Sequence, residues 1–134
     1  MSKSRYLLDT SAILTFLVDE EGAERVEMLL RNEEVIVPFV VLLETHYISL
    51  QEQSEDVADR RYALLKQLPV TFLLEIDEPT LLTAARFKAN HHITLADAMI
   101  AAYSVRQEAI LVHKDPEFEA IGDAVRQETL PYKQ

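Results

Sequence analysis

The sequence predicts an α/β fold, a three-layer α/β/α sandwich around a mostly parallel central sheet. Short apolar segments alternate along the chain with segments whose apolar residues recur at helical spacing. This alternation is typical of parallel strands joined by crossover helices. The chain also contains only 2 glycines among its 134 residues, which leaves little room for long loops. We therefore expect one domain over residues 1–134, large enough to bury a core without disulfides.

The expected strands are short apolar runs that end at an acidic residue or at proline. Residues 5–8 form such a run before Asp9, and residues 34–37 are rich in β-branched side chains and stop at Pro38. Further strands are expected at 70–74, at 109–112 and, as an edge strand, at 125–130.

The expected helices follow from apolar periodicity and from proline. Apolar residues recur every three or four positions in residues 21–32, which is helical spacing. Proline suits the first turn of a helix, so Pro38 and Pro116 each mark a helix start. Helices are expected at 10–18, 21–32, 38–52, 57–68, 78–89 and 94–107, with a last short helix from Pro116.

Composition and charge exclude several classes of protein. The formal net charge of −10 argues against a broad basic face for nucleic acid. It does not argue against a nuclease, because cations bound to carboxylates cancel negative charge where a phosphate must lie. There is no cysteine, signal peptide or apolar run long enough to span a bilayer. We expect a cytoplasmic protein without membrane contacts. If the protein is a nuclease, a few local cations are available for the flanking nucleic-acid backbone: Arg86, Lys88, Arg106 and Lys114.

Four acidic residues lie in or next to apolar or helix-starting segments: Asp9, Glu44, Asp97 and Asp115. A carboxylate beside the core is costly unless a cation or a hydrogen-bond donor meets it. In parallel sheets, ligands collect outside the carboxyl ends of the strands, where Asp9 and Asp115 are expected. Four converging carboxylates indicate a bound divalent cation and metal-assisted chemistry on phosphate.

Three of the four acidic residues also suit ordinary helix starts. Asp9 is a favoured N-cap, and Asp115 precedes a proline, as at many helix N-termini. Asp97 stands three residues after Thr94, the spacing of a capping box. For these residues a structural role and a functional role both remain open.

Glu44 has no such structural explanation. Its helical neighbours are all apolar or aromatic: Val40, Val41, Tyr47 and Ile48. A glutamate inside that stripe is expected to be at least partly buried, and buried glutamates are rare unless they are paired or bind a cation.

Residues 7–14, Leu-Leu-Asp-Thr-Ser-Ala-Ile-Leu, resemble the opening motif of PIN-domain ribonucleases. Residues 43–44, 95–102 and 111–118 resemble the three later motifs of that family, in the same order. The length is similar to that of VapC-type toxins of prokaryotic toxin–antitoxin pairs. The resemblance covers essentially the whole chain and implies a single PIN-like nuclease domain over residues 1–134.

This resemblance implies a metal-dependent endoribonuclease with one or two Mg²⁺ or Mn²⁺ ions. Asp9 and Asp97 would be direct metal ligands, and Asp115 a direct or water-mediated one. Glu44 would orient a metal-bound water that attacks the phosphorus, leaving 5′-phosphate and 3′-hydroxyl ends, and Ser11 would support Asp9. The implied partners are an RNA substrate, a cognate antitoxin and a second copy of the chain in a homodimer.

The chain departs from the family pattern at two positions. The family often has threonine where this chain has His113, so a hydroxyl contact to metal-bound water is in question. It often has a second aspartate where this chain has Glu117. Glutamate keeps the carboxylate but changes its reach, so either Asp115 or Glu117 is the last metal ligand.

Other functions fit less well. A PIN-fold protein that only binds RNA or protein has no need to keep four costly carboxylates. A receiver domain needs an early acidic pair, and a haloacid-dehalogenase-like phosphatase needs Asp-x-Asp after the first strand, where this chain has Asp9-Thr10-Ser11. A purely structural scaffold explains the helix caps but does not explain Glu44.

Overall fold

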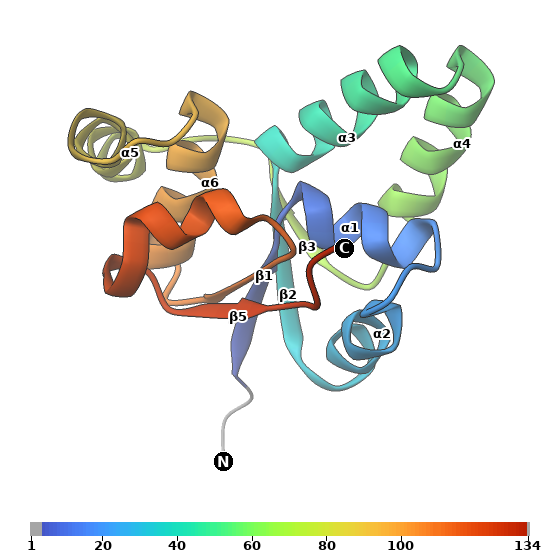
Figure 1. Cartoon of the computed structure of the whole chain (residues 1–134), viewed down its shortest axis with the longest axis horizontal. Helices are drawn as coiled ribbons and strands as arrows, with labels where there is room; N and C mark the ends of the chain where they lie inside the picture. The colour runs from blue at the N-terminus through green and yellow to red at the C-terminus, as the bar shows by residue number, and fades with distance from the viewer. Residues whose placement is uncertain (1–3, 134) are drawn as a thin grey trace.

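The computed structural model describes residues 4–133 and contains a five-stranded sheet between two layers of helices (Figure 1). The strand order is β3-β2-β1-β4-β5, and every neighbouring pair is parallel. The strands are β1 (Arg5–Leu8), β2 (Glu34–Pro38), β3 (Thr71–Leu73), β4 (Ile110–His113) and β5 (Gln127–Thr129). The predicted α/β/α sandwich is confirmed.

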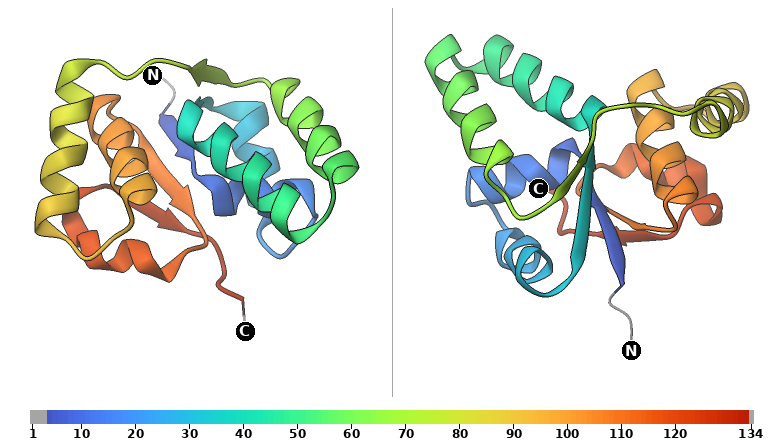
Figure 2. Two further views of the ribbon diagram at one scale, coloured as in Figure 1. Left: turned by 90° about the horizontal axis from the view of Figure 1, so that it is seen from above. Right: turned by 180° about the vertical axis from the view of Figure 1, so that it is seen from behind.

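The helices divide between the two faces of the sheet according to the direction in which the chain winds (Figures 1 and 2). From β1 the chain moves outward to β2 and β3, and it then returns to β4 on the other side of β1. Right-handed crossovers place the helices of these two halves on opposite faces. One side carries α1 (Thr10–Leu17), α2 (Ala23–Asn32), α3 (Phe39–Glu52) and α4 (Glu55–Lys66). The other carries α5 (Glu78–Asn90), α6 (Leu95–Arg106) and the 3₁₀ helix η1 (Pro116–Ala124).

This winding creates a switch point between β1 and β4. The two strands are neighbours, with Leu7 paired to Leu111 and Leu8 to Val112. The backbone N–H of Asp9 donates to the carbonyl of Val112 at 3.1 Å, so the residue after β1 stays attached to the end of β4. Crevices at such points are where open α/β sheets bind ligands.

The central strands are buried on both faces, which explains why they read as continuous apolar runs. Val35, Ile36 and Val37 of β2 are almost wholly buried, as are Leu111 and Val112 of β4. Helices from both layers pack on this sheet and complete the core.

Small differences from the predicted boundaries have local causes. The helix predicted at 57–68 begins at Glu55, because the hydroxyl of Ser54 caps it by accepting the N–H of Val57 at 3.2 Å. The helix predicted at 21–32 begins at Ala23, because Gly22 has a φ of 104° and this left-handed conformation does not continue a helix.

Candidate active site

Asp9 lies at the carboxyl end of β1 and caps α1. Its carboxylate accepts the N–H of Ala12 at 2.8 Å and the hydroxyl of Ser11 at 2.7 Å, so the predicted N-cap is present. Asp9 is only 2% exposed. Burial raises the pKa of Asp9 to about 8; the two hydrogen bonds oppose this rise, and the charges of Asp97 and Asp115 add to it.

Ser11 links Asp9 to the segment that follows β4. Its hydroxyl donates to Asp9 and accepts the backbone N–H of Lys114 at 2.8 Å. The contact between Ser11 and Asp9 implied by the family resemblance is therefore present. One hydroxyl fixes both the Asp9 carboxylate and the start of the loop that carries Asp115.

Glu44 lies on α3 and is half-buried, as its helical neighbours predict. Its Oε1 accepts the hydroxyl of Thr10 at 2.7 Å. Burial raises the pKa of Glu44, the hydrogen bond from Thr10 lowers it, and the nearby charge of Asp115 raises it again. Glu44 thus lies near the charge of Asp115, as Asp9 does.

Asp97 lies in the first turn of α6 and is 7% exposed. Its backbone N–H donates to the hydroxyl of Thr94 at 3.1 Å, which is half of the predicted capping box. Within residues 4–133 its carboxylate forms no ion pair, and a hydrogen bond from the Thr94 side chain lowers its pKa. Burial raises the pKa of Asp97 to about 7, and the charges of Asp115 and Glu44 add to the rise. The cap residue Thr94 therefore contacts both the backbone and the carboxylate of Asp97, but it supplies no positive charge for the carboxylate.

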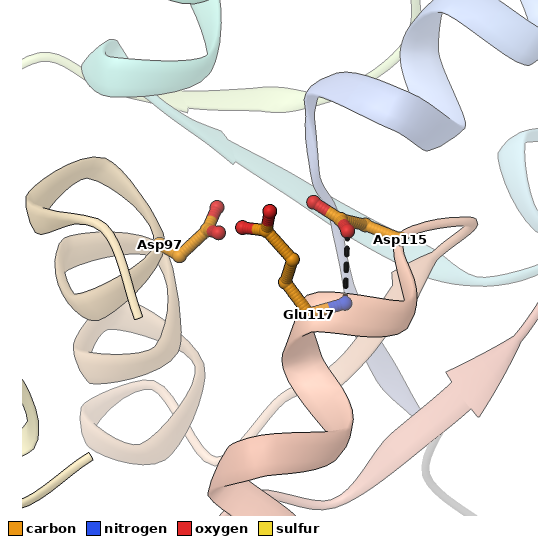
Figure 3. Close-up of side chains that lie close together, drawn as sticks. All are labelled: Asp97, Asp115 and Glu117. Atoms are coloured by element: carbon orange, nitrogen blue, oxygen red, sulfur yellow. Dashed lines mark hydrogen bonds between the residues drawn. The ribbon is translucent and has the colours of Figure 1, made fainter. Parts of the chain in front are cut away.

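Asp115 and Glu117 come from the segment between β4 and η1. Asp115 is half-buried and Glu117 is exposed. A carboxylate oxygen of Asp115 accepts the backbone N–H of Glu117 at 2.9 Å (Figure 3). One oxygen each of Asp97, Asp115 and Glu117 lies within 4.8 Å of the others, and the three side chains point toward one another. Both candidates for the last ligand thus face Asp97.

His113 occupies the position where the family often has threonine, and it makes a different set of contacts. Its Nδ1 accepts the backbone N–H of Asp115 at 3.1 Å, so the proton sits on Nε2 and is donated to Gln127 Oε1 at 2.8 Å. The ring is fully buried, and burial lowers the pKa of His113. A neutral His113 thus holds the backbone of Asp115 in place. No sequence motif marks Gln127 for this role, because only the pairing of β4 with β5 brings it to His113.

The donor set at the switch point fits a hard divalent cation. The pKa values of Asp9, Glu44 and Asp97 are raised in part by the charges of neighbouring carboxylates, among them Asp115 and Glu117. Within residues 4–133, none of these five carboxylates forms a salt bridge with lysine or arginine. Oxygen ligands without a protein counter-charge are what Mg²⁺ and Mn²⁺ prefer.

Two hollows border this acidic group. The first has a volume of about 530 Å³, and its walls include Glu117, Lys88 and His92. The second has a volume of about 330 Å³, and its walls include Asp115 and Lys114. Pro116 lines both hollows, so the two adjoin at the segment that carries Asp115 and Glu117.

Several solved structures share this fold. A chain in the structure of VapBC2 from Rickettsia felis, bound to a promoter DNA fragment, has a TM-score of 0.77 at 15% identity, covering 95% of this chain and 99% of that chain. A chain of VapBC-1 from nontypeable Haemophilus influenzae has a TM-score of 0.70 at 25% identity, covering 93% of this chain and 97% of that chain. VapC20 from Mycobacterium tuberculosis, a toxin that cleaves the sarcin–ricin loop, has a TM-score of 0.71 at 17% identity, covering 89% and 95%.

Sequence comparison identifies the family directly. No curated protein matches the chain closely enough to suggest a function. The profile of the PIN domain family, however, matches residues 6–124. That span contains all five carboxylates, the whole of β4 and all of β1 except Arg5. The chain belongs to the PIN domain family.

Proposed function

We propose that this protein is a metal-dependent endoribonuclease and the toxin component of a toxin–antitoxin pair. The observation that carries this proposal is Asp97, which is 7% exposed, forms no ion pair within residues 4–133 and faces other acidic side chains. A buried carboxylate without a positive partner is costly, and a bound cation removes that cost.

The acidic residues then divide into ligands and a proton-handling group. Asp9, Asp97 and Asp115 would hold one or two Mg²⁺ or Mn²⁺ ions. Such an ion supplies Lewis-acid activation of water and stabilises negative charge on the phosphate. Thr10 holds one oxygen of Glu44, which leaves the other free to accept a hydrogen bond from the attacking water. None of these roles requires a covalent enzyme intermediate.

Asp115 is the better candidate for the last ligand, although Glu117 also has an oxygen within 4.8 Å of Asp97. Asp115 is half-buried, and its backbone is fixed by His113. Its charge raises the pKa values of Asp9, Glu44 and Asp97, so it is near all three carboxylates. Glu117 is exposed, and its longer side chain costs more entropy to fix.

The proposed partners are RNA, a cognate antitoxin and a second copy of the chain. VapC20, which shares the fold, cleaves RNA of the sarcin–ricin loop, and other solved relatives are VapBC toxin–antitoxin complexes. Exposed apolar side chains on α3 and α4 are typical of protein contact surfaces: Leu43, Tyr47, Leu50, Tyr62 and Leu64. No helix within residues 4–133 is both long and apolar enough to cross a membrane.

The alternative is a PIN-fold protein that binds RNA or protein without cutting. The test is cleavage of an end-labelled RNA pool by antitoxin-free protein, with Mg²⁺ or Mn²⁺ compared with EDTA. We expect Asp97→Asn to lower metal-dependent cleavage by more than about 100-fold, since even the outer partners of metal ligands contribute about 10–100-fold. The matched control is Glu128→Gln, the same chemical change at a carboxylate on β5, which should cut at the wild-type rate.

The possible results separate the two functions. Folded wild-type protein that binds RNA but does not cut it would favour the binding-only alternative. Cleavage that persists both in EDTA and in Asp97→Asn would contradict the proposed metal site. Equal losses in Asp97→Asn and Glu128→Gln would indicate a general effect of removing charge.

A further inference from the structure

Lys114 is a nearly buried cation beside the proposed metal ligands. It is 9% exposed, follows β4 directly, and lines the second hollow together with Asp115 and Tyr132. Its backbone N–H donates to Ser11, whose hydroxyl donates in turn to Asp9. This chain of hydrogen bonds fixes the backbone of Lys114 relative to the acidic group.

The ammonium of Lys114 has no partner in the part of the chain that the structure describes. Within residues 4–133 it forms neither a salt bridge nor a hydrogen bond, and the nitrogen still reaches solvent. Lysines are rarely this buried unless they are paired. Lys133, in the same hollow, provides a contrast, because its ammonium pairs with Glu20 at 2.9 Å.

The acidic groups around the hollow are already engaged. Glu20 is paired with Lys133, and an oxygen of Asp115 accepts the N–H of Glu117. In the proposed function Asp115 also binds the cation. The charge of Lys114 is therefore left for an anion that enters the hollow.

Tyr132 adds an aromatic wall to this hollow. It is half-buried, and its hydroxyl donates to Oε1 of Glu119 at 3.0 Å. Aromatic rings bind single-stranded nucleic acids by stacking on their bases, with little dependence on sequence. A cation and an aromatic ring in one hollow match the phosphate and the base of one nucleotide.

We propose that the hollow lined by Ser11, Lys114, Asp115 and Tyr132 is a nucleotide subsite for single-stranded RNA. It holds the nucleotide next to the scissile phosphate, with the phosphate of that nucleotide on Lys114 and its base on Tyr132. The inference rests on the proposed function, because Asp115 on the wall of the hollow marks where the scissile phosphate lies. A lysine binds phosphate as a point charge, so this subsite contributes affinity without base specificity.

A local cation matters more in this protein than in most RNA-binding proteins. The formal net charge of −10 repels RNA over long distances, so general attraction does not hold the strand on the protein. Contacts next to the acidic group must do so. Lys114 is suited to this role because its stem is buried and its backbone is held by Ser11, while its ammonium reaches solvent beside Asp115.

The test measures RNA cleavage and RNA binding of charge variants. Lys114→Met keeps the aliphatic stem and removes the charge, whereas Lys114→Arg keeps the charge. The control, Arg126→Gln, removes an exposed cation from a hollow at the amino ends of the strands, opposite the acidic site. We expect Lys114→Met to raise KM for an end-labelled RNA pool about tenfold, the typical effect of a lost charged hydrogen bond, with little change in kcat. Lys114→Arg should recover most of the affinity, and Arg126→Gln should match wild type.

Salt dependence provides the readout that a merely structural role would not change. Each lost phosphate contact lowers the slope of log affinity against log salt by about 0.7 for single strands. We expect this decrease for Lys114→Met, measured by RNA binding in an Asp97→Asn background that does not cut. Tyr132→Leu should weaken binding about tenfold without changing the slope, and Tyr132→Phe should bind normally because it keeps the ring.

The results distinguish this inference from the proposed function. Wild-type cleavage together with an unchanged KM and salt slope in Lys114→Met would overturn the subsite and leave the ribonuclease intact. Folded wild-type protein that neither cuts nor binds RNA would overturn both. If Lys114→Met does not fold, Tyr132→Leu decides: unchanged RNA binding by this variant would overturn the subsite.

Discussion

Two regions of the molecule treat buried or half-buried carboxylates in opposite ways. On β5, Glu128 accepts two hydrogen bonds from Arg25, at 2.7 and 2.9 Å, and these bonds lower its pKa. At the switch point, burial raises the pKa values of Asp9 and Asp97 to about 8 and about 7, and within residues 4–133 no arginine or lysine pairs with them. The chain can balance a carboxylate with its own cation, yet it leaves the switch point unbalanced. The missing positive charge is therefore expected from a ligand.

The largest effect expected from this difference is a fall in stability with rising pH when EDTA removes divalent metal. An aspartate in the unfolded chain has an ordinary pKa of 3.8, whereas Asp9 and Asp97 titrate near 8 and 7 in the folded protein. Between these values the folded state holds protons that the unfolded state has released. The free energy of unfolding must then decrease from about pH 5 to about pH 8. We expect a decrease of about 3 kcal/mol or more, since one pKa unit corresponds to about 1.4 kcal/mol. Urea denaturation in EDTA measures it.

The pair on β5 serves as the internal reference for this measurement. Because Arg25 lowers the pKa of Glu128, the stabilisation by this pair is present above the unfolded pKa and is lost only as pH falls below it. It is constant from about pH 5 to about pH 8. Asp97→Asn should therefore reduce the pH dependence to the part that Asp9 contributes, and Glu128→Gln should leave it unchanged. A wild-type stability that does not change over this range would show that the switch-point carboxylates are balanced after all.

Divalent metal should neutralise the carboxylates at the switch point and so stabilise the folded protein, without affecting the pair on β5. At a concentration of about 100 times its Kd, a ligand adds about 2.7 kcal/mol to the free energy of unfolding. For a domain of this size that corresponds to a rise in Tm of roughly 5–10 °C. We expect Mg²⁺ or Mn²⁺ to produce this rise at about pH 8 in wild type and Glu128→Gln, and to produce none in Asp97→Asn. An equal rise in Asp97→Asn would place the metal elsewhere.

The same comparison shows what can be predicted from sequence. The fold follows from local signals, since apolar runs, helical periodicity and the prolines at 38 and 116 predict every strand and helix of residues 4–133 to within a few positions. The partial burial of Glu44 also follows from its helical neighbours alone. Strand order does not follow in this way, because it depends on the handedness and packing of whole crossovers.

The details of the site depend on contacts between distant segments. The motifs identify Asp9, Asp97 and Asp115, but the hydrogen bond from Lys114 to Ser11 joins residues 103 positions apart. The contact between His113 and Gln127 likewise requires β4 and β5 to pair. Neither contact has a sequence pattern of its own, which explains why His113 stands out in the sequence only as a departure from the family.

Glu117 and Asp115 provide a finer test within the acidic group. Asp115 is half-buried and acts on three other carboxylates, whereas Glu117 is exposed. We expect Asp115→Asn to weaken Mn²⁺ binding about 100-fold and Glu117→Gln about tenfold, the upper and lower ends for residues around a metal. Isothermal titration with Mn²⁺ measures both. The opposite order would assign the last ligand to Glu117.

The smallest expected effect is the loss of the pair on β5. The side chains of Arg25 and Glu128 are 41% and 30% exposed, so solvent screens their attraction. Exposed pairs typically contribute up to about 1 kcal/mol, and the two-point contact places this pair near that limit. Arg25→Met should therefore lower the free energy of unfolding by about 1 kcal/mol, measured by urea denaturation.

Arg25→Met also removes the guanidinium from above the ring of Tyr6, at 5.9 Å from its centroid, so the single variant overstates the pair. A double-mutant cycle with Glu128→Gln isolates the coupling between the two side chains. This coupling should weaken in high salt and should not respond to Mg²⁺. A coupling that depended on metal would join the two regions energetically, and the contrast between a balanced and an unbalanced group of carboxylates would then fail. If the coupling on β5 does not depend on metal while stability at the switch point does, then Arg25 neutralises Glu128 and the metal neutralises the switch-point carboxylates, each independently of the other.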